Sequence, residues 1–505
     1  MPSSFATQAP VGRALRHAAL AALCVLVSAG AARAGEVLTY HASNNRHGLY
    51  VVPGLTFAAA ASVTRDTAFS ATVTGDVYAQ PLYWQPKGTK TAELIVATES
   101  NVVYALNAST GAVIWQRQLP AAISSGLPCG DISPEGITGT PVIDAATGTL
   151  YLNSQTAASG SAQHALYALS LADGSILSGW PINVQSALKT AGVTFTPPQQ
   201  GERSGLLFFN GALYAAYGGR DGDCNPYHGT IVQINPATQA LAGNWETRAE
   251  GGGIWSQGGI SSDGTYLYAT TGNTFNANNV WSDGEAIIRL LPGLAHSTST
   301  KNFYAPANWQ SLDNSDLDLG GTEALPLYVD KTTSGQLPRL IALGKDGNAY
   351  LVSRTNLGGI GGPAAIKQIS NTVLITAPAV YETASLTLLA LTNFNGIECA
   401  GQKGLQVLQL LSTGANQIIP KWCAALNGEG SPIITTTDGT ANPIVWAVGA
   451  EGDNLLHGFN AVTGVAVYTG TTALSGLHRF QTLIAAGGKL YVAGDNRVYA
   501  FTFTP

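Results

Sequence analysis

Apolar positions along this chain recur in short runs rather than in long helical stripes. Each run has about four to eight residues, is rich in β-branched and aromatic side chains, and leads through a turn into a second run that often ends at an Asx-Gly or Thr-Gly corner. The clearest copies of this pattern are residues 94–115, 442–464 and 489–503. Weaker copies begin near Leu150, Ala212, Tyr266, Arg339 and Leu386. The repetition predicts antiparallel hairpins arranged in an array.

A further short run precedes each hairpin, and it begins with small residues. The eight runs are residues 79–84, 139–144, 204–209, 258–263, 323–330, 376–382, 430–436 and 480–486. Small residues suit strands that crowd around a central axis, so the repeats, spaced roughly 56 residues apart, predict an all-β, eight-bladed β-propeller with four-stranded antiparallel blades. Seven blades is the alternative if the weak repeat near Leu386 is irregular. A linear β-solenoid would repeat its strands without hairpins.

The last repeat stops at Pro505, one strand short of a complete blade. A ring must close, because an open edge strand invites aggregation. Residues 61–73 alternate weakly in hydrophobicity and belong to no repeat. We therefore expect this N-terminal segment to supply the outer strand of blade eight.

The N-terminus reads as a secretory signal and not as part of the fold. Arg13 and Arg16 precede an apolar stretch over residues 18–27, and Ala32-Arg33-Ala34 offers a signal-peptidase site. The predicted boundaries are a signal peptide over residues 1–34 and a propeller domain over residues 35–505. This predicts an exported protein, periplasmic or secreted, with no transmembrane segment in its mature chain. A lipoprotein anchored through Cys24 is the alternative, although Leu23 is not the small residue that a lipobox places before its cysteine.

Composition narrows the range of partners. Charged residues make up only 11% of the chain, and glycine contributes 59 of 505 residues, which fits buried strands joined by tight turns. Cleavage of the signal removes three of the 24 basic residues and none of the 30 acidic ones, so the formal net charge falls from −6 to −9. Such a chain lacks the clustered Lys and Arg that nucleic acids or anionic lipids require.

Four cysteines remain after cleavage, and an even number in an exported chain predicts two disulfides. Cys399 and Cys423 fall within one repeat, so we expect them to pair. Cys129 and Cys224 are then left to pair between neighbouring repeats. Four buried thiols are the alternative. The chain has no C-x-x-C metal motif and no C-x-x-C-H haem motif.

The connections that lead into the innermost strands would surround one mouth of the axial channel. They carry a recurring carboxylate, at Glu135, Glu202, Glu250, Glu323 and Glu429. Carboxylates gathered around a funnel would attract cations. Arg203, His478 and Arg479 occupy comparable positions and could pair with some of these carboxylates. All of these residues are therefore ligand-binding candidates, and ordinary loop charges that tie blades together are the alternative.

Two acidic segments are candidate calcium sites. Asp313, Asp316 and Asp318 lie in the longest connection, where three carboxylates could hold Ca²⁺ or simply serve turns and caps. Asp221, Asp223 and Asn225 match the first three ligand positions of a calcium loop. That loop lacks the glycine and the glutamate that normally follow.

Trp255 follows a run of three glycines, and glycines let the backbone approach a ligand closely. At the channel mouth its ring could stack on a flat ligand. Trp84, Trp115, Trp180 and Trp245 have the positions of blade-packing tryptophans. His228 is either a ligand or base, or a hydrogen-bonded structural histidine.

Several segments resemble the bacterial quinoprotein-like (PQQ-like) β-propeller proteins. They are GDVYAQPLYW (75–84), ATESNVVYALNASTG (97–111), CGDISPEGITGTPVID (129–144) and NPYHGTIVQINPATQ (225–239). The resemblance extends over nearly the whole mature chain and implies the propeller fold. The family includes pyrroloquinoline-quinone dehydrogenases, which use Ca²⁺ or a lanthanide ion and an aspartate base, and propellers that bind no quinone.

This chain departs from the eight-bladed dehydrogenases at one feature of their cofactor site. Those enzymes stack the quinone on a ring formed by two adjacent cysteines, and no cysteines are adjacent here. The sequence therefore favours a binding or scaffold protein, with an unknown protein or a small polar ligand as partner. A PQQ- or metal-dependent oxidoreductase acting on an alcohol or sugar, with PQQ and Ca²⁺ as cofactors, is the first alternative. A carbohydrate-active enzyme using two of the ring carboxylates is the second.

Overall fold

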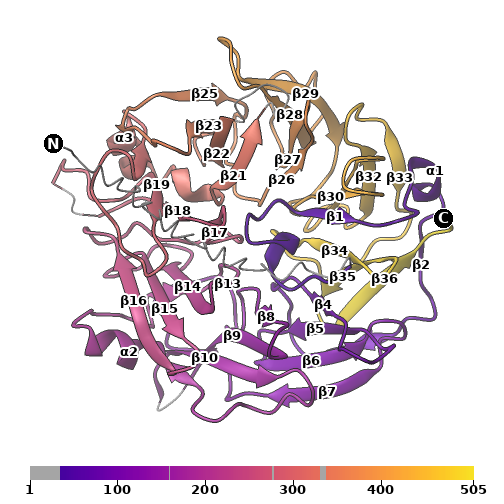
Figure 1. Ribbon diagram of the computed structural model, residues 1–505, viewed down its shortest axis with the longest axis horizontal. Coiled ribbons are helices and arrows are strands. Elements are labelled where there is room, and N and C mark those ends of the chain that lie inside the picture. Colours follow the sequence, from indigo (N-terminus) through magenta and orange to yellow (C-terminus); the bar gives the residue numbers. More distant parts are fainter. Residues whose placement is uncertain (1–34, 158–159, 276–277, 330–336) are drawn as a thin grey trace, which may run out of the picture. The chain divides into compact units, whose positions relative to one another are not determined.

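The computed structural model describes residues 35–157, 160–275, 278–329 and 337–505, and the elements carry the labels of Figure 1. The predicted signal peptide lies outside the described residues. Eight antiparallel sheets follow one another around a ring, in chain order from indigo to yellow (Figure 1). The prediction of an all-β, eight-bladed propeller is confirmed, and the seven-bladed alternative is wrong. The weak repeat near Leu386 forms a complete blade of its own.

In each blade the strands pair in chain order from the axis outwards. Blade one consists of β4 (Leu82–Trp84), β5 (Glu93–Ala97), β6 (Val102–Asn107) and β7 (Val113–Gln118). Blade two consists of β8 (Val142–Asp144), β9 (Thr149–Thr156), β10 (Gln163–Ser170) and β11 (Ile182–Asn183). Blade three consists of β13 (Leu207–Phe209), β14 (Ala212–Gly219), β15 (Thr230–Asn235) and β16 (Ala240–Glu246). Blade four consists of β17 (Ser261–Ser262), β18 (Leu267–Thr271), β19 (Ala286–Leu290) and β20 (Phe303–Ala305).

The second half of the ring repeats this order. Blade five consists of β21 (Leu325–Val329), β22 (Leu337–Leu343), β23 (Asn348–Ser353) and β25 (Ala364–Gln368). Blade six consists of β26 (Ala379–Glu382), β27 (Thr387–Asn393), β28 (Gly404–Leu410) and β29 (Ile418–Ala425). Blade seven contains β30 (Ile433–Thr436), β31 (Ile444–Val448), β32 (Leu456–Asn460) and β33 (Ala466–Thr469). Blade eight contains β34 (Leu483–Ala486), β35 (Lys489–Gly494) and β36 (Arg497–Thr502). All eight runs that begin with small residues contain the innermost strand of a blade.

Short elements decorate the ring. In the described residues the helices include η1 (Tyr40–Ala42), α1 (Phe57–Ala60), α2 (Val184–Thr190), α3 (Trp309–Ser315) and η3 (Leu319–Gly321). Two short strands extend existing sheets: β12 (Gln200–Gly201) pairs with β14, and β24 (Gly359–Ile360) runs parallel to β20. The longest connection predicted from the sequence, which follows β19, is not an irregular loop throughout. It contains strand β20 and helix α3. No helix in the described part of the chain is long and apolar enough to span a membrane.

The N-terminal segment closes the ring, as predicted. Strands β2 (Thr64–Arg65) and β3 (Ala71–Thr72) both pair antiparallel with β36 and complete blade eight at its outer edge. The sequence did not predict β1 (Leu49–Val51), which runs parallel to β30 at the inner edge of blade seven.

Residues 37–48, which we call the axial segment, fill the centre of the ring and contact every blade (Figure 1). Their contacts reach the innermost strand of each sheet or the residue directly before it. The partners, in blade order, are Tyr83, Ile143, Phe208, Ser262, Pro326, Val380, Ile434 and Thr482. The axial segment therefore links all eight blades at the axis of the ring.

Arg46 anchors the axial segment. Its side chain is fully buried, and its guanidinium donates to six acceptors. These are Thr39 Oγ1 and the carbonyl oxygens of Tyr40, Gly205, Leu206, Gly258 and Ile260, at 2.6–3.3 Å. A buried charge is stable only when it is fully hydrogen-bonded, and here the planar fork of arginine joins blades three and four to the axis.

Hydrophobic side chains pack in layers between neighbouring sheets. Between blades five and six, for example, Leu327 and Ile341 face Leu389 and Leu408, all fully buried. The predicted packing tryptophans belong to such layers. Trp115, for instance, donates through Nε1 to the Leu171 carbonyl of the next blade at 2.8 Å.

The two disulfides are those predicted, Cys129–Cys224 between neighbouring blades and Cys399–Cys423 within blade six. Stable disulfides indicate an oxidising compartment.

Candidate functional site

Two kinds of loop meet on one face of the ring. Because the strands of a blade alternate in direction, the connection into the first strand and the turn between the second and third strands lie at the same end of the sheet. Around the axis these loops enclose a cavity of about 390 Å³, which we call the mouth pocket. Its charged and polar lining residues are Asp131, Arg203, Arg220, Asp221, Asp223, Asn273, Asp316, Asp318, Lys345 and Arg479.

An indole ring with a cation above it lines the mouth pocket. Trp255 donates through Nε1 to Asp318 Oδ2 at 3.1 Å, which fixes its ring. Lys345 Nζ lies 5.1 Å from the centroid of that ring and forms ion pairs with Asp318 at 2.7 Å and Asp316 at 2.9 Å. An aromatic face beside an ammonium group suits a flat, anionic ligand.

Three oxygen-bearing side chains, Asp223, Asn273 and Asp318, meet beside this indole, and we call them the oxygen trio. With its amide nitrogen toward the carboxylates, Asn273 donates to Asp223 Oδ2 at 3.3 Å and to Asp318 Oδ1 at 3.1 Å. With the amide turned over, its carbonyl oxygen joins the two carboxylates, and three oxygens placed in this way could serve as ligands of a hard cation. Burial and the neighbouring carboxylates of Asp318 and Asp316 raise the pKa of Asp223 to about 6.

Two arginines and a phenylalanine form another part of the wall. Arg479 lies 2.8 Å and Arg203 3.7 Å from the carboxylate of Asp131, and Arg203 also lies over the ring of Phe480 at 5.7 Å. Asp131 and Arg479 are 348 residues apart in the chain, and closure of the ring brings them together. Both guanidinium groups are partly exposed to the cavity and can exchange this carboxylate for one on a ligand.

Backbone strain concentrates at the mouth pocket. Asp223, Asp316 and Phe480 all line it and adopt left-handed conformations, with φ of 47°, 51° and 70°. A bulky aromatic residue rarely adopts such a φ, and strained residues of this kind cluster at ligand sites. The Cys129–Cys224 disulfide links the loop that carries Asp131 to the loop that carries Asp223. The pocket wall is thus held in place by covalent and conformational constraints.

The glutamates predicted to ring the mouth occupy different positions. Glu135, Glu202 and Glu323 are buried in the ring, where Glu135 pairs with Arg220 behind the pocket wall. Glu250 and Glu429 are half-buried, and Glu429 lines a separate cavity of about 310 Å³. Aspartates, and not these glutamates, supply the open carboxylates of the mouth pocket.

Glu323 illustrates what such burial does. It accepts a hydrogen bond from the Gly258 N–H at 3.3 Å, and Arg46 and Tyr40 are the ionisable groups that face it from the axial segment. Burial raises the pKa of Glu323 to about 7 although Arg46 opposes the shift. The folded protein therefore holds a proton that the unfolded chain loses above pH ~4.5.

We expect Glu323→Gln to change how stability depends on pH. Between about pH 4.5 and 7, Glu323 is ionised in the unfolded chain but still protonated in the folded protein. Each rise in pH within this window therefore lowers the free energy of unfolding of the parent protein, by up to about 1.4 kcal/mol per pH unit. The variant lacks this loss, so its stability relative to the parent should rise over that window and stay level above it. Urea unfolding at pH 5, 6, 7 and 8 measures the difference, with Glu398→Gln at a surface ion pair as control. A difference that is independent of pH would contradict the assignment.

The three aspartates of the long connection do not converge on one point. Asp313 accepts hydrogen bonds from Thr274 N at 2.9 Å and Thr274 Oγ1 at 2.8 Å, whereas Asp316 and Asp318 line the mouth pocket. Asp221 and Asp223, from the calcium-like segment, line the same pocket.

The other candidates are placed as follows. Trp255, Arg203 and Arg479 lie at the mouth pocket, and His478 precedes Arg479 in the loop into blade eight. His228 Nδ1 lies 2.8 Å from the Thr247 carbonyl, which is the structural arrangement.

Sequence reasoning missed Asp131, Asn273 and Lys345. Asn273 and Lys345 lie in turns between second and third strands, whereas the charged residues predicted to surround the mouth were taken only from the connections into first strands. The signals were present as TGN at residues 271–273 and GKDGN at residues 344–348, each directly after a buried β run.

No family model matches the chain, and no curated protein matches it. Solved structures do match. A quinohemoprotein alcohol dehydrogenase from Comamonas testosteroni has a TM-score of 0.62 at 15% identity, over 94% of this chain and 81% of that chain. A europium-containing methanol dehydrogenase has a TM-score of 0.64 at 12% identity, over 93% and 98%. A quinohemoprotein alcohol dehydrogenase from Pseudomonas putida has a TM-score of 0.64 at 13% identity, over 93% and 80%.

These likenesses define the class of fold. The chain has the eight-bladed β-propeller fold, and it is similar in fold to these dehydrogenases. Identities of 12–15% show the fold and not the activity, so the function has to be argued from the site.

Proposed function

We propose that the mouth pocket binds a planar polycarboxylate quinone beside a Ca²⁺ or lanthanide ion, and that the protein is a quinone-dependent oxidoreductase of an alcohol or sugar. The observation that carries the proposal is the oxygen trio next to the face of Trp255. The solved structures with this fold include quinohemoproteins and a europium-containing enzyme, which gives the proposal its chemical class.

The oxygen trio fits a hard cation. Ca²⁺ takes six to eight oxygen ligands from carboxylates and amide carbonyls, and Asp223, Asn273 and Asp318 supply both kinds. Their net charge of −2 is offset only in part by the Lys345 ammonium, which lies 2.7 Å from Asp318 and also pairs with Asp316. An ion at this position would add charge compensation where burial already disfavours ionisation of Asp223.

The remaining lining residues fit the quinone. Trp255 offers a flat face, Phe275 and Phe480 add aromatic surface, and Arg203 and Arg479 offer guanidinium groups to carboxylates. The adjacent-cysteine ring of the related dehydrogenases has no counterpart here. The Cys129–Cys224 disulfide instead ties together the loops that carry Asp131 and Asp223.

When bound, a quinone would accept two electrons and one proton, together a hydride, from the hydroxyl-bearing carbon of an alcohol, which leaves as an aldehyde or ketone. The protein then has to bind the substrate and take up its hydroxyl proton. Asp316 is suited to that step, because it lines the pocket outside the oxygen trio and its side chain is 64% exposed. Lys345 holds this carboxylate in place at 2.9 Å.

A binding protein without turnover is the second candidate, as the sequence favoured. One observation supports it: Arg203 and Arg479 are already paired with Asp131, which competes with any carboxylate ligand. In that case the pocket would hold a small anion and pass no electrons.

Two measurements test the proposal. Trp255 lies close enough to the trio to sensitise Tb³⁺, so excitation of the indole should give terbium emission that Ca²⁺ competes away. A ligand at about 100 times its dissociation constant stabilises the folded state by roughly 2.7 kcal/mol, so a quinone with Ca²⁺ should raise the melting temperature more than either component alone.

Turnover is then assayed with an alcohol and an artificial electron acceptor, because the sequence has no haem motif. Cooperative binding with turnover supports the oxidoreductase, and binding without turnover supports the second candidate. Absence of both terbium emission and a melting shift would refute the proposed site.

A further inference from the structure

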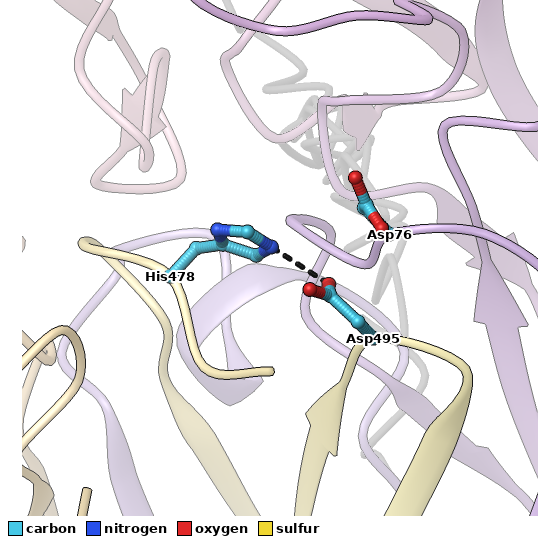
Figure 2. A group of neighbouring side chains, drawn as sticks. All are labelled: Asp76, His478 and Asp495. Atoms are coloured by element: carbon cyan, nitrogen blue, oxygen red, sulfur yellow. Dashed lines mark hydrogen bonds and ion pairs between the residues drawn. The ribbon is translucent and has the colours of Figure 1, made fainter. Parts of the chain in front are cut away.

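A second group of metal-ligating side chains lies outside the mouth pocket, where blade eight meets blade one. Asp76 lies between β3 and β4, His478 between β33 and β34, and Asp495 in the turn between β35 and β36 (Figure 2). One ligand atom from each lies within 4.8 Å of the other two. Among the described residues, no other three His, Cys, Asp or Glu side chains meet this condition.

The imidazole of His478 is held from two sides. Nε2 lies 2.7 Å from Asp495 Oδ1, and the ring stacks on Tyr78 with centroids 4.3 Å apart and planes 17° apart. Nδ1 faces Glu451, whose Oε1 is 3.9 Å away. Nε2 is therefore the nitrogen directed at the two aspartates, as Figure 2 shows. The stacking on Tyr78 and the hydrogen bond to Asp495 together fix the orientation of the ring.

Backbone hydrogen bonds keep the two carboxylates side by side. Asn496 N donates to the Gly75 carbonyl at 3.1 Å, and Gly75 N donates to Asn496 Oδ1 at 3.0 Å. The residues next to Asp76 and Asp495 are thus bound to each other. Glu451 has its own partner, since it accepts a hydrogen bond from the Arg479 N–H at 3.0 Å and lies 4.0 Å from the Arg479 guanidinium. One histidine cannot balance the charges of the two aspartates, so the group calls for a cation.

We propose that Asp76, His478 and Asp495 bind a divalent first-row transition metal, Zn²⁺ or Mn²⁺. One imidazole nitrogen and two carboxylate oxygens are ligands that these ions accept, and three protein ligands leave a position for water. The ligand set differs from the oxygen trio, which offers no nitrogen ligand and suits Ca²⁺ or a lanthanide. The proposal does not depend on the proposed function.

The metal would stabilise the loop that shapes the mouth pocket. His478 directly precedes Arg479 and Phe480, which line that pocket. Asp76 belongs to the stretch that leads from the outer strand of blade eight into blade one. An ion bound by both would join these two stretches at the junction where the ring closes.

Isothermal titration of the mature protein, stripped with chelator, tests the site with Zn²⁺ and Mn²⁺ as probes. We expect about one equivalent to bind saturably at this ligand set. His478→Gln and Asp76→Asn should each weaken that affinity at least ~100-fold, more than loss of an outer-shell partner does. Asp453→Asn is the matched control, since Asp453 pairs with His457 at 3.1 Å without a third ligand, and it should leave the affinity unchanged.

Two outcomes would overturn the proposal. One is no saturable binding of either ion to the parent protein, which would mean that His478 and Asp495 form an ion pair only. The other is equal binding to the parent, His478→Gln and Asp76→Asn, which would place the ion elsewhere. Ca²⁺ distinguishes the two sites: it should compete with Tb³⁺ at the oxygen trio and leave the Zn²⁺ affinity unchanged.

Discussion

Arg46→Met is expected to lower the free energy of unfolding by roughly 3–5 kcal/mol, a large part of the stability of an ordinary domain. The substitution keeps the aliphatic volume but removes the guanidinium donors of six buried acceptors, of which the Leu206 carbonyl keeps a second donor in Thr39 Oγ1. It also leaves Glu323 buried without the guanidinium that now opposes the rise of its pKa. Several unsatisfied buried groups are among the few mechanisms that destabilise so strongly.

Chemical unfolding followed by tryptophan fluorescence measures the effect, with the exposed Arg497→Met as control. The double variant Arg46→Met with Glu323→Gln should recover part of the loss, because it removes the uncompensated carboxylate. If Arg46→Met does not accumulate as folded protein, Arg46→Lys keeps the charge with at most three donors and should give an intermediate loss. A loss below about 1 kcal/mol would show that water replaces the guanidinium.

Asp318→Asn is expected to abolish the Tb³⁺ emission sensitised by Trp255, with a loss of affinity of at least ~100-fold. Asp318 is the residue on which the proposed cation site converges. It accepts from Trp255 Nε1 at 3.1 Å and from Asn273 N at 2.8 Å, and it pairs with Lys345 at 2.7 Å. An asparagine of the same size removes the charge, and hard cations select carboxylates over neutral amides.

Asp313→Asn is the matched control for this prediction. Asp313 lies in the same connection but bonds to Thr274 and does not line the mouth pocket. Its variant should bind Tb³⁺ like the parent protein. Trp255→Phe should retain binding, measured by calorimetry, while losing the emission. Equal losses in Asp318→Asn and Asp313→Asn would mean that the connection as a whole, and not the trio, controls the signal.

The ring could be predicted from the sequence because each blade repeats a local signal. Strands such as β26 and β30 begin after small residues, lie beside the axis and carry β-branched or aromatic side chains. Closure by residues 61–73 followed from the missing strand after Phe501. The axial segment could not be predicted in this way, because residues 37–48 have no periodicity and their eight partners lie in eight different blades.

The site was only partly predictable for a related reason. Trp255, Arg203 and Arg479 lie in connections that the pattern placed at one mouth. Asp131 meets Arg479 only because the ring closes, and Asn273 approaches Asp223 only because two adjacent blades set their turns side by side. The pairing of a carboxylate with an amide 50 residues later is a property of the assembled ring and leaves no local pattern.

The axial segment also has a consequence for the order in which the molecule can be built. Residues 37–48 are synthesised before every blade, yet their contacts end at Ile434 and Thr482. They cannot dock fully until the last blade has been made, so their docking depends on contacts across almost the whole chain, which is the slowest kind to form. A chain that ended after blade six would lack β30, the partner of β1. It would also lack β36, the strand with which β2 and β3 pair. The first residues of the folded domain can thus reach all their final contacts only when the last blade is present.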